Sequence, residues 1–94
     1  MSNLRSRLEI MLCVLSVVMD GVEKPTWIMY AVNLSWVSTQ GILARLVEQD
    51  LLREREEKGN RMSRRRYEIT ERGENVLRYF GGAKELINIK EIIT

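Results

Sequence analysis

Arginine is concentrated in one short stretch of the sequence, just after the turn-forming tripeptide Lys58-Gly59-Asn60. Four arginines follow this tripeptide with no acidic residue between them. Together with the lysine of the turn they form the first candidate site: Lys58, Arg61, Arg64, Arg65 and Arg66. Guanidinium groups at the tip of a turn can lie along phosphates or enter the minor groove of a DNA duplex. The alternative is a solvated hairpin whose arginines pair with Glu54, Glu56 and Glu57, and such surface pairs stabilise little. Because the charge peaks at the predicted tip, we favour DNA binding.

A second set of candidate residues follows Asn33 and Leu34. Ser35 predicts a helix N-terminus, because its hydroxyl can accept a hydrogen bond from a free backbone N–H. The predicted outward face of this helix carries no acid until Glu48, and its candidate DNA contacts are Ser35, Trp36, Thr39, Gln40 and Arg45. Glutamine can read adenine, and arginine can reach guanine or phosphate. This pattern is typical of a recognition helix.

Each of these residues also has a structural interpretation. For Ser35 and Thr39, capping and packing compete evenly with DNA contact, and for Ser38 packing is favoured. Trp36 is expected as a half-buried cover over the turn more than as a direct contact. Gly41 costs on the order of 1 kcal/mol in a helix interior, and tight packing is favoured slightly over close approach by another backbone.

Two residues at the start of the preceding helix are further candidates. Lys24 and Thr26 flank Pro25, which favours the first position of a helix. They could contact phosphate where this helix end crosses the DNA backbone, and a plain helix start explains them nearly as well.

Composition argues against metal and covalent chemistry. The chain has no histidine, and Cys13 is its only cysteine, so one chain cannot assemble the usual transition-metal ligands or a Cys-His or Ser-His pair. We expect no enzyme activity, no metal and no cofactor. A lone thiol among apolar neighbours predicts a reducing compartment, the cytoplasm.

The first predicted helix, from about residue 3 to 20, carries two apolar stripes. The first stripe is expected to face the core, and its members are Leu4, Leu8, Met11, Leu12, Leu15, Val18 and Met19. The second is expected to bind a partner chain, and its members are Ile10, Cys13, Val14 and Val17. The apolar run is too short for a membrane span, so no membrane association is expected.

The remaining elements follow from local signals. Helices are expected over about 25–32 and from Ser35, followed by a two-stranded hairpin and a helix capped by Thr70. Gly81 and Gly82 should break or kink that helix. This divides the chain into a domain of residues 1–80 and a helical tail of residues 81–94, a candidate dimerisation element.

This order of elements predicts a mainly α (α+β) fold. It is a winged helix-turn-helix, with three helices, a two-stranded β-hairpin wing and a C-terminal helix.

Several fragments together resemble one family. They are Ser6-Arg7-Leu8-Glu9-Ile10, Ile28-Met29-Tyr30, Asn33-Leu34-Ser35-Trp36 and Tyr67-Glu68-Ile69-Thr70-Glu71-Arg72-Gly73. The sequence resembles the small archaeal winged-helix family of transcription regulators and chromatin proteins. The resemblance implies DNA binding and dimerisation through a C-terminal helix, which assigns Leu86, Ile89 and Ile93 to the interface. Two features depart from the family: the Gly81-Gly82 interruption, and Asp50 where a glycine often ends the recognition helix.

The leading hypothesis is therefore a homodimeric protein of the cytoplasmic nucleoid that binds double-stranded DNA. Its candidate dimer contacts are Ile10, Val14, Val17, Leu86, Ile89 and Ile93. The alternative is a winged-helix module that binds another protein and not DNA. Net charge does not separate them, because it is only +2.

Overall fold

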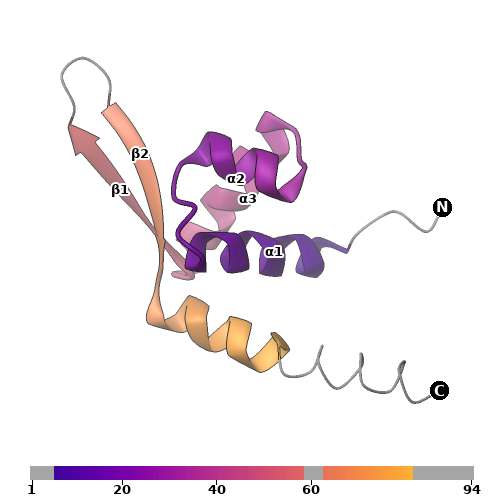
Figure 1. The fold of residues 1–94 in the computed structure, drawn as a ribbon. Helices are drawn as coiled ribbons and strands as arrows, with labels where there is room; N and C mark the ends of the chain where they lie inside the picture. Colours follow the sequence, from indigo (N-terminus) through magenta and orange to yellow (C-terminus); the bar gives the residue numbers. More distant parts are fainter. Residues whose placement is uncertain (1–5, 59–62, 82–94) are drawn as a thin grey trace.

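Three helices, an antiparallel hairpin and a further helix follow one another along the chain (Figure 1). A computed structural model describes residues 6–58 and 63–81. Its labelled elements are α1 (Arg7–Met19), α2 (Pro25–Val32), α3 (Trp36–Glu48), β1 (Leu52–Lys58) and β2 (Ser63–Ile69), and residues 71–81 are helical. The predicted winged helix-turn-helix fold is confirmed.

Short-range sequence signals set the helix ends. The Ser6 hydroxyl accepts a hydrogen bond from the Glu9 N–H at 3.1 Å and so caps α1. Beyond Asp20, Gly21 has φ +102°, a backbone conformation that glycine adopts without steric cost. Asn33 adopts the left-handed conformation (φ 57°) that ends α2, as predicted. Asp50, which follows α3, adopts the same left-handed conformation (φ 60°). The aspartate at this position, where the family often has glycine, is therefore compatible with the backbone.

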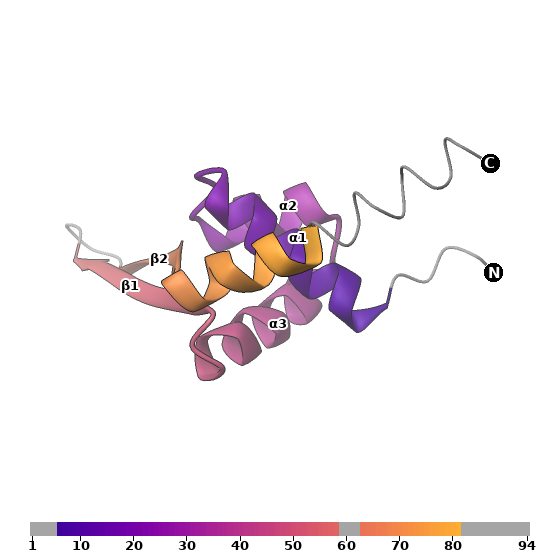
Figure 2. The same cartoon turned by 90° about the horizontal axis from the view of Figure 1, so that it is seen from below.

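The core joins all three labelled helices to the base of the hairpin. Its buried members are Val14, Leu15, Val18, Ile28, Val32, Leu43, Leu46, Leu51, Leu52 and Tyr67. Val76 and Leu77 of the C-terminal helix pack against this cluster. Figure 2 shows that helix crossing in front of α1, with α2 on one side and α3 on the other. The wing and α3 are therefore held to one body.

The two strands of the wing pair antiparallel, with Leu52 opposite Ile69 at the base and Lys58 opposite Ser63 at the far end. The Tyr67 N–H donates to the Glu23 carbonyl at 3.0 Å, which ties β2 to the segment between α1 and α2. The hairpin is thus fixed at its base and projects away from the helices (Figure 1).

Thr70 joins the C-terminal helix to the turn after α3. Its hydroxyl oxygen accepts from the Gly73 N–H at 3.0 Å, and the hydroxyl lies 2.7 Å from the Asp50 carbonyl oxygen. A Cβ at Gly73 would lie 2.3 Å from the Leu51 carbonyl oxygen, so no other residue fits there without movement. The capping role predicted for Thr70 is confirmed.

The division of α1 into a core stripe and a partner stripe was wrong. Val14, expected at a dimer interface, is fully buried in the core, whereas Leu8 and Met19, expected in the core, are about half exposed. The buried arc of α1 is centred between the two stripes, because the core around α1 draws on α2, α3 and the base of the wing. Val17 is half-buried and packs against that core.

Gly81 was expected to break or kink the C-terminal helix, and it is helical. An added Cβ there would meet nothing within 4 Å. The rest of the predicted tail, with Leu86, Ile89 and Ile93, lies outside the described residues, so the division at residue 80 stays a prediction. Within residues 6–58 and 63–81, no helix is long and apolar enough to cross a membrane.

Candidate nucleic-acid interface

The outward face of α3 is formed by small and apolar side chains. Val37 is 80% exposed, and Gly41 and Ala44 continue the exposed ridge at helical spacing until it ends at the charged Glu48. The opposite side buries Thr39, Leu43 and Leu46. A ridge without bulky groups allows a helix to enter a DNA groove closely, and apolar atoms can contact a thymine methyl group.

The first turn of α3 is organised by two serines and a threonine. The Ser35 hydroxyl accepts from the Ser38 N–H at 3.1 Å and donates to the Ser38 hydroxyl at 3.0 Å, so Ser35 is the predicted N-cap. Thr39 is fully buried, and its hydroxyl donates to the Ser35 carbonyl at 2.8 Å. Thr39 is therefore not available to DNA, and the prediction that it contacts DNA was wrong.

Ser38 and Thr39 exchange the roles expected of them. Ser38, for which packing was favoured, is exposed beside Ser35, and the packed residue is Thr39. One position along a helix turns a side chain by about 100°, so a shift of one residue in the buried face decides the matter. The sequence pattern left Thr39 open and favoured the wrong residue, Ser38, for packing.

The three longer candidates of α3 differ in exposure. Arg45 is exposed, Trp36 is 47% exposed and Gln40 is half-buried. Trp36 is thus more exposed than a buried cover would be, and its role over the turn stays a prediction. All three keep surface that a ligand can reach.

In the strands of the wing, arginines pair with glutamates. Arg65 Nε lies 3.2 Å from a Glu54 carboxylate oxygen, and Arg55 pairs with Glu68. The hydrogen bond and the charge of Glu68 raise the pKa of Arg55. The cross-strand pairing considered as the alternative interpretation therefore holds for Arg65, and for Arg66 through Glu57. The Arg65 pair is largely exposed and contributes little stability.

Arg66 differs from the other arginines of the wing. Its side chain is only 31% exposed and lies between two acids, with Nε 3.2 Å from Glu57 and a terminal nitrogen 3.6 Å from Glu23. The buried Nε forms no hydrogen bond of good geometry, so the contact with Glu57 is chiefly electrostatic. Arg66 thus joins the wing to the loop before α2, and its contact with DNA stays a prediction. Glu23, its partner outside the hairpin, gave no signal in the sequence.

The other wing candidates lie toward its tip. Lys58 ends β1, and Arg64 lies opposite Glu57 in the strand register. The side chains of both, and all of Arg61, lie outside the described part of the structure. Their contact with DNA stays a prediction.

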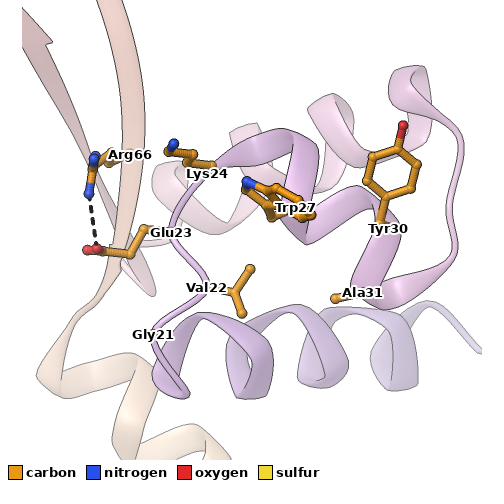
Figure 3. A pocket seen from close by; sticks show the side chains of 8 residues that line it. All are labelled: Gly21, Val22, Glu23, Lys24, Trp27, Tyr30, Ala31 and Arg66. Carbon is orange, nitrogen blue, oxygen red and sulfur yellow. Dashed lines mark ion pairs between the residues drawn. The ribbon is translucent and has the colours of Figure 1, made fainter.

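An aromatic groove lies along α2 and the loop that precedes it (Figure 3). Trp27 and Tyr30 are 61% and 67% exposed, with ring centroids 6.4 Å apart, and they line the groove with Lys24 and Arg66. Figure 3 shows Trp27 and Tyr30 on the near side of α2, with α3 behind that helix and Arg66 on β2. The two aromatic side chains therefore lie away from the side of α2 that faces α3. Sequence analysis missed the groove, although the two aromatics lie opposite the buried Ile28 and Val32 on a helical wheel.

The two phosphate candidates on α2 are placed at its start, as expected. Lys24 occupies the N-cap position without a side-chain capping bond, and both Lys24 and Thr26 are exposed. Among the described residues, no group of three or more His, Cys, Asp or Glu side chains could hold a metal ion.

Comparison with solved structures gives the same fold. Sso10a-2, a DNA-binding protein from Sulfolobus solfataricus, is 28% identical, with 95% of this chain and 85% of that chain covered and a TM-score of 0.72. The smu.1704 protein of Streptococcus mutans UA159 is 20% identical over 99% and 93%, with a TM-score of 0.82. Lactococcus lactis ZitR, solved in complex with DNA, is 17% identical over 97% and 62%, with a TM-score of 0.69. The match thus spans less than two thirds of ZitR.

A search of curated protein sequences gave no match. The family model described as winged helix-turn-helix matches residues 4–88, nearly the whole chain. It covers the helices, the hairpin and the capped C-terminal helix described above. The chain belongs to the winged helix-turn-helix family.

Proposed function

We propose that this protein binds double-stranded DNA as a homodimer and acts as a transcription regulator or chromatin protein. In this proposal α3 enters the major groove, and the wing lies on the backbone or in the minor groove. Such a protein would work at the nucleoid in the cytoplasm.

The exposed face of α3 carries the proposal. No acid interrupts it between Ser35 and Val47, it combines small side chains with Gln40 and Arg45, and its N-terminus is capped and held to the core. Similarity to Sso10a-2, described as DNA-binding, and to ZitR, solved with DNA, supports the same function.

Within this proposal the wing supplies affinity and α3 supplies base reading. Charge on phosphates is largely blind to sequence. Because Arg65 and Arg66 are engaged by glutamates, we assign the main phosphate contacts of the wing to Lys58, Arg61 and Arg64. Lys24 and Thr26 would hold phosphate at the start of α2.

The test is duplex affinity across a salt series for the wild type and for the double variant Arg61→Ala, Arg64→Ala. We expect weaker binding and a logarithmic salt slope that is shallower by roughly two, because about one counterion is released for each phosphate contact. Arg78→Ala, on the C-terminal helix, is the matched control for loss of charge. Absence of duplex binding by the wild type at low salt would contradict the proposed function, and an unchanged slope would contradict the role of the wing.

A protein-binding module without DNA binding is the second candidate, and the exposed aromatic groove favours it. Trp27 and Tyr30 expose much of their rings, and aromatic residues are enriched at protein interfaces. A pull-down with the wild type and with Trp27→Ala separates the candidates. Capture of one stoichiometric partner, lost in Trp27→Ala and accompanied by no retention on duplex DNA, would favour the module.

A further inference from the structure

Gly41 lies in the middle of α3 although the folded chain does not need a glycine there. The residue is helical and exposed, and a Cβ built on it would meet nothing within 4 Å. The tight packing favoured from the sequence is therefore wrong. Alanine would stabilise the helix at this position, so the glycine calls for a reason outside the described chain.

Gly41 also lines a groove between α1 and α3. The groove is lined by Arg7, Ile10, Met11, Ser38, Gly41, Ile42 and Arg45. Figure 2 shows the N-terminal half of α1 beside α3 at this place. Ile10, a candidate dimer contact, is half-buried here against the recognition helix. A side chain at position 41 would begin to fill the groove.

The charge of this groove is positive. Among the described residues that line it, Arg7 and Arg45 are the ionisable ones, and both are exposed. Neither forms an ion pair with another residue in the described ranges 6–58 and 63–81. Arg55, Arg65 and Arg66 of the wing strands, by contrast, are paired with glutamates, whereas Arg7 and Arg45 are available to a polyanion.

We propose that this groove receives the sugar–phosphate backbone of one DNA strand at the edge of the major groove entered by α3. Arg7 and Arg45 contact phosphates from either helix, the exposed Ser38 hydroxyl can donate to a phosphate oxygen, and Gly41 leaves the space that the strand occupies. The inference rests on the proposed function, and it extends the interface from α3 to the start of α1.

The first test compares Gly41→Ala with Gly81→Ala. Both glycines are helical and exposed, with no neighbour within 4 Å of an added Cβ, and Gly81 lies outside the groove. Gly41→Ala should raise the midpoint of thermal unfolding and weaken duplex binding about tenfold, because a methyl group crowds a close contact. Gly81→Ala should leave duplex affinity unchanged. Unchanged affinity in Gly41→Ala, with a wild type that still binds, overturns the groove and leaves the proposed function standing.

The second test removes the charges. Arg7→Ala and Arg45→Ala should each reduce the logarithmic salt slope by roughly one, with Arg78→Ala as the control. An unchanged slope in Arg7→Ala overturns the assignment of α1 to the interface. A change of sedimenting mass in Gly41→Ala or Arg7→Ala, with duplex affinity intact, would assign the groove to a second copy of the chain and would also overturn the proposal.

Discussion

At the scale of single residues, Tyr67 places a phenol side chain in the core at the base of the wing. It is 3% exposed in the core, while its backbone N–H holds the loop before α2. Burial raises the pKa of the Tyr67 hydroxyl, because the charged phenolate would lose its hydration. The neighbouring charge of Glu54 acts in the same direction.

This shift predicts a loss of stability at alkaline pH. Because the folded pKa lies above the unfolded value of about 10, the contribution of Tyr67 is fully present below pH 10 and falls as the pH rises above it. Tyr67→Phe should therefore lose less unfolding free energy than the wild type above about pH 10. Urea unfolding at several pH values measures this, with the exposed Tyr79→Phe as control. Parallel curves for Tyr67→Phe and the wild type would contradict it.

Residue roles were predictable where the signal is local and unpredictable where it depends on a distant partner. The Ser35 cap follows from one side chain and the next turn of backbone, and it was found. The pairing of Arg66 with Glu57 was among the alternatives, whereas its second partner Glu23 lies far from it in sequence and could not be found from a local pattern. The buried and exposed positions of Ser38 and Thr39 were exchanged. Both residues are small and polar, so their types do not show which of the two faces the core.

At the scale of elements, the joint between α3 and the C-terminal helix depends on Thr70. Its hydroxyl caps that helix at Gly73 and reaches the carbonyl of Asp50, and its backbone N–H donates to the Leu51 carbonyl at 3.1 Å. A single buried side chain thus satisfies backbone groups of two segments. The absence of a side chain at Gly73 lets the C-terminal helix approach the Leu51 carbonyl closely, which brings the two segments within reach of the Thr70 hydroxyl.

Replacing Thr70 tests the joint. Thr70→Val keeps the shape but leaves the Gly73 N–H and the Asp50 carbonyl without their partner, so we expect a loss of about 1–3 kcal/mol in the free energy of unfolding. Thr70→Ser retains the hydroxyl and should lose clearly less. Denaturant titration followed by far-ultraviolet circular dichroism measures both. Equal losses in the two variants would show that the methyl group matters and the hydroxyl does not.

Element boundaries could be read from the sequence more accurately than element faces. Pro25, Asn33 and Asp50 mark backbone geometry that each residue permits by itself. The buried face of α1 depends on which elements pack around it, and an all-apolar helix gives no contrast from which to choose. Leu8 and Val14 exchanged places for that reason.

At the scale of the whole molecule, large apolar side chains remain exposed outside α2 and α3 as well. Leu8 and Met19 on α1 are 48% and 51% exposed, and Tyr79 on the C-terminal helix is 74% exposed. A domain this small buries a modest core, and uncovered apolar surface is typical of proteins that associate. Because Val14 lies in the core, we propose Leu8, Met19 and Tyr79 in its place as contacts of the proposed homodimer, together with the predicted tail residues Leu86 and Ile89.

Sedimentation at micromolar concentration tests the homodimer directly. We expect a mass near twice the 11.0 kDa of the chain, and a thermal midpoint that rises with protein concentration, because association stabilises only the folded state. Leu86→Glu with Ile89→Glu should shift the mass toward that of the monomer, since charge is costly in an apolar interface. Val37→Ser removes a comparable exposed apolar side chain from α3 and should leave the mass unchanged. A monomer at all concentrations would contradict the homodimer, and duplex binding by that monomer would then have to rest on one copy of α3, one wing and the groove beside Gly41.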